Sequence, residues 1–402
     1  MMQIAIIDDV GFGSGKSGLF GKELYVELLA KVNKEFLGNE VLRVTLGGVV
    51  KGVKGFTVRG SGARVLRIVY DPGLEEGLYR LLRRSGVDVI HANIINPRYP
   101  RHVVKVSKRL GIPIVTTVHS WAYVCPSGWA VRLPEQVPCS AGVQPHCVKC
   151  LYSLAELYKL NKALKVLDAF NQYEALKHLL RNSKAVISPS RLLTDAIRRS
   201  TGISNVYTIP NPIREDLLRL KPSYTRERAV AFYARLSYEK GAHLIPIIAK
   251  ALRDVKIHVM GAGPLKQLIV RASRKYHNLI YHGYVPDDVK VEIVRRSSLA
   301  ILPALYCETF GYSVIEALAL GKPVVAFNLC GPKEIIESSK GGVLVRPFNL
   351  YDFINEVGGL LENPALLASM GRSGHSFVER LSPQAYANEL RRVYEGVLSL
   401  NT

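Results

Sequence analysis

The chain has 402 residues, of which 48% are hydrophobic and 22% are charged. This composition is typical of globular domains and excludes a largely disordered chain, and the length suggests roughly two or three domains. The 54 Lys and Arg residues outnumber the 33 Asp and Glu residues, which gives a net charge of +21. Such a surplus favours anionic partners, which include nucleotide diphosphates, phospholipid headgroups and nucleic acid, without choosing among them.

The apolar segments are all short. No run reaches the roughly 18 apolar residues that cross a bilayer. Residues 1–7 are apolar but end at Asp8 and Asp9, and they lack a basic leader and a cleavage site, so they predict a strand and not a signal peptide. We therefore expect a cytoplasmic protein that can work at the inner face of the membrane.

In the first half of the chain, short apolar runs alternate with helical patterns. A helix is expected near residues 21–32. Strands are expected at residues 3–7, 87–91, 114–118, 185–188 and 206–209. These runs are apolar throughout, as in strands buried on both faces, and strands separated by helices predict a parallel sheet.

Two prolines and a charged stretch interrupt this series at residues 210–225, which predicts a linker. The alternation then resumes. Strands are expected at residues 230–233, 257–260, 279–281, 299–302 and 324–327, and helices at 241–251, 287–295, 312–320, 350–361 and 383–398. We predict an α/β protein with two Rossmann-like doubly wound domains, residues 1–210 and 226–380, and a C-terminal segment, residues 381–402, that packs back on the first domain.

The glycine-rich loop at residues 10–18 resembles two phosphate-binding patterns incompletely. The P-loop pattern would need a glycine where Val10 stands, and the dinucleotide pattern lacks its distant acidic residue. A strand, a glycine loop and a helix N-terminus nevertheless offer backbone amides to an anion. We expect Gly13 and Gly15 to contact the ligand, and the alternative is a flexible turn without one.

Two loops in the second domain follow expected strands. Arg235 and Lys240 lie on the first, where two cations can neutralise a diphosphate leaving group, although solvated loop charges are the alternative. The segment 260–264 carries Gly261 and Gly263, and glycines there let a ligand or a neighbouring backbone approach closely.

The most informative segment runs from Glu308 to Glu316. It places one carboxylate on a loop and the other inside a helix, where both can accept hydrogen bonds from sugar and ribose hydroxyls. The amides of Phe310, Gly311 and Tyr312 lie at the helix N-terminus, where they can hold phosphate. The alternative is a capping acid followed by a solvated helix glutamate.

This segment, with Thr-Phe-Gly inside it and Gly-Lys-Pro-Val-Val after it, resembles the retaining GT-B glycosyltransferases of family 4. The resemblance extends over most of the chain. It includes Arg235 to Gly241, Gly261 to Pro264, residues 282–286, residues 112–119 and residues 187–190. The family usually has Asp after its histidine, where this chain has Ser120, and often has Gly-Gly where this chain has Cys330 and Gly331.

The resemblance implies a role for each matching residue. Glu308 would contact the donor sugar, Glu316 the ribose, Arg235 and Lys240 the diphosphate. Gly263 belongs to the matching glycine segment. Tyr284 and Val285 would contact the base, and His119 would lie at the reacting centre, although a buried structural histidine is the alternative.

The implied reaction is retaining transfer from a UDP- or GDP-sugar to a hydroxyl of a lipid-linked or polysaccharide acceptor, without a catalytic metal. Catalysis would depend on orientation and on neutralising the leaving diphosphate. An epimerase or a phosphorylase of the same fold is the first alternative. A phosphorylase would need a lysine motif that binds pyridoxal phosphate, and this sequence shows none. A nucleic-acid-binding protein is the second, and no recognition motif supports it.

Four cysteines gather in the loop 125–150. Cys125, Cys139, Cys147 and Cys150 predict a structural zinc site or an iron–sulfur cluster, with His146 as a substitute ligand. Two disulfides are the alternative in an oxidising or hyperthermophilic setting. Cys307 and Cys330 lie elsewhere in the sequence, and we expect both to be reduced.

Residues 151–199 contain nine basic and four acidic residues together with four aromatic residues. A basic amphipathic face of this kind could dock on anionic lipid, and a solvated helix face explains the pattern equally well.

Overall fold

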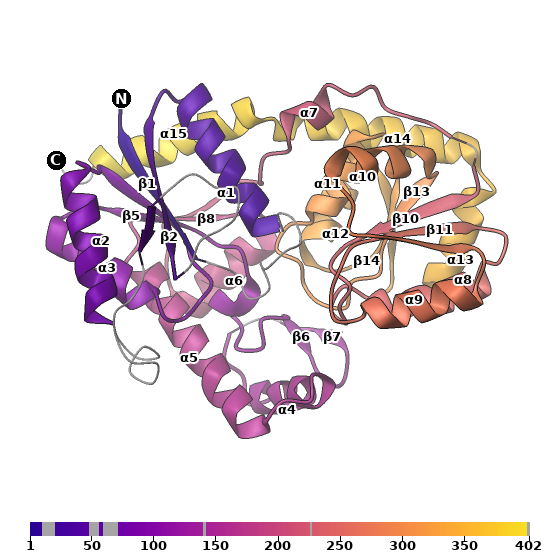
Figure 1. The fold of residues 1–402 in the computed structure, drawn as a ribbon, viewed down its shortest axis with the longest axis horizontal. Coiled ribbons are helices and arrows are strands. Elements are labelled where there is room, and N and C mark those ends of the chain that lie inside the picture. The colour runs from indigo at the N-terminus through magenta and orange to yellow at the C-terminus, as the bar shows by residue number, and fades with distance from the viewer. Residues whose placement is uncertain (10–20, 48–55, 59–70, 140–141, 226, 400–402) are drawn as a thin grey trace. The chain divides into compact units, whose positions relative to one another are not determined.

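The computed structural model describes residues 1–9, 21–47, 56–58, 71–139, 142–225 and 227–399. The chain divides into two compact units, Met1–Pro212 with Pro383–Thr402, and Ile213–Ser382. Each unit is a parallel β-sheet with helices packed around it (Figure 1). The predicted fold class is therefore confirmed, and the linker prolines lie where the two units meet in sequence.

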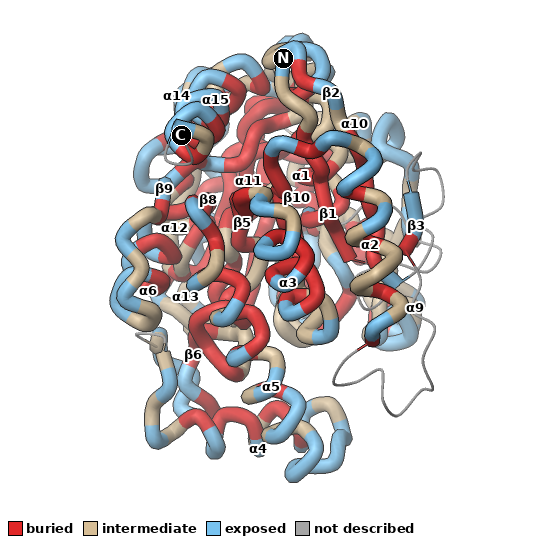
Figure 2. Tube along the Cα trace, turned by 90° about the vertical axis from the view of Figure 1, so that its left-hand side faces the viewer, coloured by how far each residue is buried: buried red, intermediate tan, exposed pale blue. Residues whose placement is uncertain are grey.

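The first unit contains a seven-stranded sheet in the order β3-β2-β1-β4-β5-β8-β9, with every pairing parallel. The strands are β1 (Gln3–Asp9), β2 (Glu40–Leu46), β3 (Phe56–Val58), β4 (Val89–Asn93), β5 (Ile114–Thr117), β8 (Ala185–Ser188) and β9 (Val206–Thr208). Ile4, Ala5, Ile6 and Ile7 are consecutive and fully buried, because helices cover both faces of the sheet. Figure 2 shows this burial along β1, β5 and β8.

The helices of the first unit have clear end signals. They are α1 (Gly21–Lys31), α2 (Pro72–Arg84), α3 (Pro100–Leu110), α5 (Lys162–Arg181), α6 (Arg191–Thr201) and α15 (Pro383–Ser399), and the π-helix η1 (Val32–Phe36) continues α1. Asp71 caps α2 by accepting a hydrogen bond from the Leu74 amide, and left-handed glycines end α3 and α6. The C-terminal helix α15 contacts η1, so the chain returns to its first unit.

A small module is inserted after β5. It consists of a 3-10 turn, η3 (Trp121–Tyr123), a hairpin of β6 (Val131–Arg132) and β7 (Val137–Pro138), and helix α4 (Cys147–Leu157). Helix α4 packs against α5. All four cysteines of the loop 125–150 belong to this module.

The second unit contains a six-stranded parallel sheet in the order β12-β11-β10-β13-β14-β15. The strands are β10 (Ala229–Tyr233), β11 (Lys256–Met260), β12 (Leu279–Gly283), β13 (Leu299–Leu302), β14 (Val324–Phe327) and β15 (Gly342–Val345). The helices are α7 (Glu215–Leu218), η4 (Ala242–Leu244), α8 (Ile245–Ala251), α9 (Lys266–Lys275), α10 (Asp287–Arg296), α11 (Tyr312–Ala319), α12 (Cys330–Ser339), α13 (Leu350–Leu361), α14 (Pro364–Val378) and η5 (Glu379–Leu381). Because parallel strands end at one edge of a sheet, the loops after β10, β11, β13 and β14 lie close together.

Candidate active site

The loop after β10 carries the two predicted cations. The Lys240 ammonium donates a hydrogen bond to Glu308 Oε1 at 2.7 Å, and the two side chains are 22% and 8% exposed. Burial by itself would lower the pKa of Lys240, but the Glu308 carboxylate and the Tyr306 phenol outweigh burial, so this pKa is raised. Arg235 is exposed, and no ion pair to it is found among the described residues. The Lys240 ammonium is therefore fixed by its partner, whereas the Arg235 guanidinium faces solvent.

Glycines allow this loop to pack closely against the neighbouring backbone. At Gly241 (φ +72°), a Cβ would lie 1.9 Å from the Pro303 carbonyl oxygen, and at Gly263 (φ +158°) it would lie 2.5 Å from the Leu236 carbonyl oxygen. The Leu236 amide also donates to the Ala262 carbonyl at 2.9 Å. The predicted donor-binding residue Gly263 therefore lets the loop after β11 pack directly against the loop that carries Arg235.

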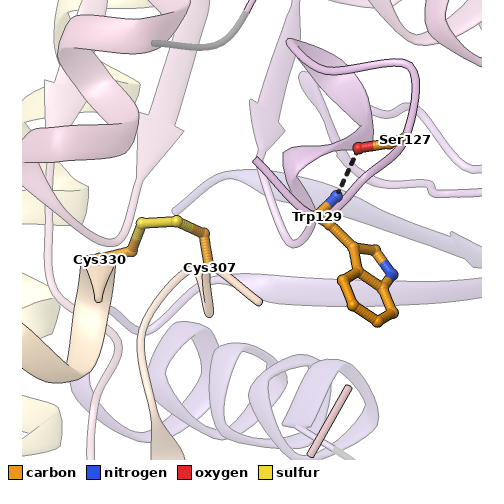
Figure 3. The surroundings of a disulfide bond; sticks show 4 residues. All are labelled: Ser127, Trp129, Cys307 and Cys330. Atoms are coloured by element: carbon orange, nitrogen blue, oxygen red, sulfur yellow. Dashed lines mark hydrogen bonds between the residues drawn. A yellow bond between two sulfur atoms is a disulfide. The ribbon is translucent and has the colours of Figure 1, made fainter. Parts of the chain in front are cut away.

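Glu308 lies on the loop between β13 and α11 and is 7% exposed. Its carbonyl accepts a hydrogen bond from the Gly331 amide at 3.0 Å, and Gly331 leaves no room for a Cβ beside Phe310. The residue before it, Cys307, forms a disulfide with Cys330, with a Cα–Cα distance of 5.1 Å (Figure 3). The expectation that both cysteines are reduced is wrong. The two loops follow the adjacent strands β13 and β14, which brings residues 23 positions apart into bonding distance.

Glu316 lies inside α11, one turn beyond its start, and is 7% exposed. Lys290 of α10 donates to both of its carboxylate oxygens, at 3.1 and 3.3 Å, and also lies 3.1 Å from Asp287. Burial alone would lower the pKa of Lys290, but Glu316 and Asp287 outweigh it and raise this pKa. Sequence reasoning missed Lys290, although its position three residues after Asp287 at a helix start was a visible cue.

Helix α11 begins directly after Gly311, whose φ of +115° is unfavourable for other residues. Phe310 is buried, and Tyr312 is the first residue of the helix. The positive end of the helix thus lies between the positions of the two glutamates, which suits a phosphate group.

The segment predicted to contact the base follows β12. The Tyr284 side chain is 55% exposed, whereas Val285 packs partly against the core of the second unit. Of these two residues, Tyr284 therefore offers the accessible surface, and that surface is aromatic.

His119 lies in the first unit, two residues after the end of β5. Its Nε2 is 2.8 Å from Asn93 Oδ1, and its ring lies edge-on to Tyr25 with 4.7 Å between ring centres. Burial, followed by the charge of Lys22 and by His91, holds the pKa of His119 well below its usual value. The imidazole is therefore neutral at pH 7, and its Nε2–H donates to Asn93. Asn93 was missed because a single Asn at a strand end has no distinctive pattern.

A buried ion pair lies near His119. Lys22 donates to Asp9 Oδ1 at 2.6 Å, and Asp9 Oδ2 accepts from the amides of Ile95 and Asn96.

The glycines Gly13 and Gly15, which the sequence predicts to contact the donor, lie outside the described residues.

In the described part of the chain, none of the four loop cysteines forms a disulfide, and Cys125, Cys147 and Cys150 are buried. The amides of Leu133 and Gln144 donate to the sulfurs of Cys150 and Cys147 at 3.2 and 3.3 Å, and Cys139 Sγ lies 3.4 Å from His146 Nε2. Burial raises the pKa of Cys147 and of Cys150, and the neighbouring thiols add to the effect. Across the described part of the chain, no three His, Cys, Asp or Glu side chains lie close enough to hold a metal. The metal site stays a prediction.

Two family models match this chain. The model described as Glycosyl transferases group 1 matches residues 214–377, and the model described as Glycosyltransferase Family 4 matches residues 53–217. This chain belongs to the glycosyltransferases of the group 1 and family 4 type. The two matches adjoin near the linker, so each unit of the glycosyltransferase has its own family counterpart.

Individual relatives agree with this assignment. The phosphatidyl-myo-inositol mannosyltransferase of Mycobacterium leprae (strain TN) is 28% identical over 203 residues, which are 48% of this chain and 54% of the relative, so the match spans about half of that relative. Sucrose-phosphate synthase from Thermosynechococcus elongatus aligns over 100% of both chains with a TM-score of 0.76 and 17% identity. Anabaena HepE in complex with UDP-glucose aligns over 98% of this chain and 100% of its own, with a TM-score of 0.70 and 17% identity. These likenesses show the GT-B fold.

Proposed function

We propose that this chain transfers a sugar, with retention of configuration, from a UDP- or GDP-sugar to a hydroxyl of a lipid-linked or polysaccharide acceptor. One observation carries the proposal. Two lysine–glutamate pairs, Lys240 with Glu308 and Lys290 with Glu316, lie on either side of the start of α11. A nucleotide-sugar presents hydroxyls and a diphosphate, which these carboxylates, cations and helix amides match.

The diphosphate would bind Lys240, Arg235 and the N-terminus of α11. A bound diphosphate competes with Glu308 for the Lys240 ammonium, because two phosphate charges attract it more strongly than one carboxylate. The Glu308 oxygens are then available to the sugar hydroxyls. Glu316 accepts from the ribose hydroxyls while Lys290 keeps its charge compensated. The complex of the structural neighbour HepE with UDP-glucose supports a nucleotide-sugar donor.

In the transfer step, the bond between the sugar and the phosphate breaks, and a bond from the sugar to the acceptor oxygen forms on the same face. The acceptor proton passes to the departing phosphate. The protein contributes orientation and stabilises the charge on the leaving diphosphate. The neutral imidazole of His119 suits a hydrogen bond to the sugar and not a charge contact. We expect no catalytic metal in this scheme.

The inserted module supports a lipid-linked acceptor. The module and the start of α5 that follows it carry exposed apolar side chains, which are Val137, Val143, Val148, Tyr152, Leu157, Leu160, Leu164 and Leu167. Leu160, Leu164 and Leu167 recur at helical spacing where α5 begins, with Lys162 and Lys165 between them. An apolar stripe beside lysines fits an anionic bilayer surface. The name of the mycobacterial relative, a phosphatidyl-myo-inositol mannosyltransferase, agrees with a lipid acceptor. In the described residues, no helix is both long and apolar enough to span a membrane.

The donor proposal is tested with Glu308→Ala and Glu316→Ala, and Glu337→Ala serves as the exposed control. Glu308→Ala should lower kcat by about 10²-fold or more, because it removes a contact to the reacting sugar. Glu316→Ala should weaken nucleoside diphosphate binding about tenfold to a hundredfold, because it removes a charge-assisted hydrogen bond. Full activity in both variants would make the segment purely structural.

The donor base is found by melting the protein with UDP, GDP, ADP, TDP and their sugars. A bound donor should raise Tm. No shift with any of them would refute the proposal, and conversion of the donor sugar without an acceptor would favour an epimerase instead.

The membrane surface is tested by flotation with anionic and zwitterionic vesicles. The wild-type chain should float with anionic vesicles, and Leu164→Glu with Leu167→Glu should abolish flotation. Leu366→Glu, at an exposed leucine of the second unit, is the matched control. Equal behaviour of all three proteins would contradict a docking role for the α5 stripe.

A further inference from the structure

The disulfide between Cys307 and Cys330 lies directly beside the predicted sugar-binding residue. Cys307 immediately precedes Glu308, and Cys330 is the first residue of α12, after β14. The bond therefore ties the loop that carries Glu308 to the loop that follows the neighbouring strand (Figure 3). Neither cysteine was predicted as a site residue.

The same two loops make several close noncovalent contacts. The Gly331 amide donates to the Glu308 carbonyl at 3.0 Å. A Cβ at Gly331 would lie 2.5 Å from the Phe310 carbonyl oxygen, and a Cβ at Gly311 would lie 3.2 Å from Pro332 Cγ. Hence the geometry on both sides of Glu308 depends on where the start of α12 lies.

The backbone at Cys330 indicates that this position is under constraint. Its φ is +45°, in the left-handed region that non-glycine residues disfavour. Glycine would adopt this conformation without cost, and the chain has cysteine there instead. A side chain at such a position is best explained by what it bonds to, which is Cys307.

We propose that the Cys307–Cys330 disulfide positions Glu308 for the donor sugar, so that the oxidised chain is the form competent in transfer. Cys307 and Cys330 are thus positioning residues of the active site. The inference rests on the proposed function, since it concerns the residue that contacts the sugar. Cys307 is 1% exposed, whereas Cys330 is partly exposed, so a reductant reaches the bond from the Cys330 side.

Reduction by dithiothreitol breaks the sulfur–sulfur bond, leaves two protein thiols and converts the reagent to its cyclic disulfide, with two electrons and two protons transferred. The loop then keeps only its noncovalent contacts. We expect reduction to lower kcat for sugar transfer about tenfold, because a small displacement of a group at the reacting centre is costly. Nucleoside diphosphate affinity should change less than kcat does, because Glu316 is fixed within α11 and by Lys290, and because Lys240 and Arg235 lie on the loop after β10, which the disulfide does not tie.

The experiment first counts thiols under denaturing conditions, where oxidised protein should show four reactive thiols of six and reduced protein all six. Transfer and nucleoside diphosphate binding are then measured for both forms. Using the wild-type chain in two redox states avoids a variant that fails to fold. The comparison variant carries Cys307→Ala and Cys330→Gly, where glycine suits the positive φ. It should transfer slowly, bind the diphosphate normally and ignore dithiothreitol.

Three results would overturn the inference. Six reactive thiols in the oxidised protein would show that the bond does not form. Equal kcat in both redox states would show that the bond does not position Glu308. An equal response of wild type and variant to dithiothreitol would trace the effect to other cysteines. By contrast, failure of the oxidised wild type to bind any nucleoside diphosphate would refute the proposed function itself, and this inference with it.

Discussion

Removing the charge of the Lys240 side chain should lower both the free energy of unfolding and the rate of sugar transfer. In the Lys240→Met variant, the Glu308 carboxylate, 8% exposed, loses the ammonium that lies 2.7 Å away. A fully buried pair costs about 3–5 kcal/mol when one partner is removed, and an exposed pair costs about 0–1 kcal/mol. Because Lys240 is itself 22% exposed, we place the loss between these limits, at about 2 kcal/mol.

For a unit of this size, a loss of about 2 kcal/mol lowers Tm by about 4–8 °C. The matched control is Lys256→Met, which breaks an ion pair to Glu227 of similar length, 2.8 Å, but with side chains 57% and 37% exposed. Because an exposed pair costs about 0–1 kcal/mol, this control should lower Tm by less than about 4 °C. Thermal melting of both variants at pH 7 measures the difference.

A double variant separates the lost pair from other effects. Lys240→Met combined with Glu308→Gln leaves no buried unpaired charge, so it should recover most of the lost stability while transfer stays abolished. Transfer by Lys240→Met alone should fall by about 10²-fold or more, since a cation at the leaving diphosphate is gone. If Lys240→Met and Lys256→Met melted alike and both transferred normally, the ion pair would have neither a stabilising nor a catalytic role.

Two further predictions concern the first unit. Burial lowers the pKa of His91 to about 3. The unfolded chain therefore binds a proton at His91 more readily than the folded chain does. As the pH drops below about 6.5, the free energy of unfolding should fall by at most about 1.4 kcal/mol per pH unit. Urea unfolding at pH 7 and pH 5 measures this slope, which should become shallower in His91→Gln, and an unchanged slope would refute the assignment. If the four loop cysteines form the predicted zinc site, elemental analysis should find about one equivalent of metal per chain. The double variant Cys147→Ser, Cys150→Ser should lose this metal. Wild-type protein without metal would refute the site.

The strands that the sequence predicted share one physical property. They are apolar throughout, as at Ile4 to Ile7, because both faces of a parallel sheet are covered. Strand β2 escaped detection because Arg43 and Thr45 alternate with apolar residues. Both are buried. Thr45 donates to Asp8 of β1 at 2.9 Å and Arg43 donates to Glu27 of α1 at 2.6 Å, so their partners lie on other elements, which the local pattern of β2 does not show.

Helix α12 was missed for a related reason. It begins Cys330-Gly-Pro, a sequence that locally favours a turn. In the structure, the glycine is required by the close approach of Phe310, and the proline occupies the first turn, where a missing amide costs nothing. Here tertiary contacts decided the local structure.

The sequence by itself determined the two α/β units, the loops that carry Arg235, Lys240, Glu308 and Glu316, and the family, because apolar periodicity and motif spacing are local properties of the chain. Only the tertiary structure decided how these charges are paired. Lys290 reaches Glu316 from another helix, Asn93 holds His119 from another strand, and Cys307 bonds to Cys330 across two parallel strands. Such pairings depend on which strand lies beside which, and sheet order is set by packing of the whole unit and not by any single segment.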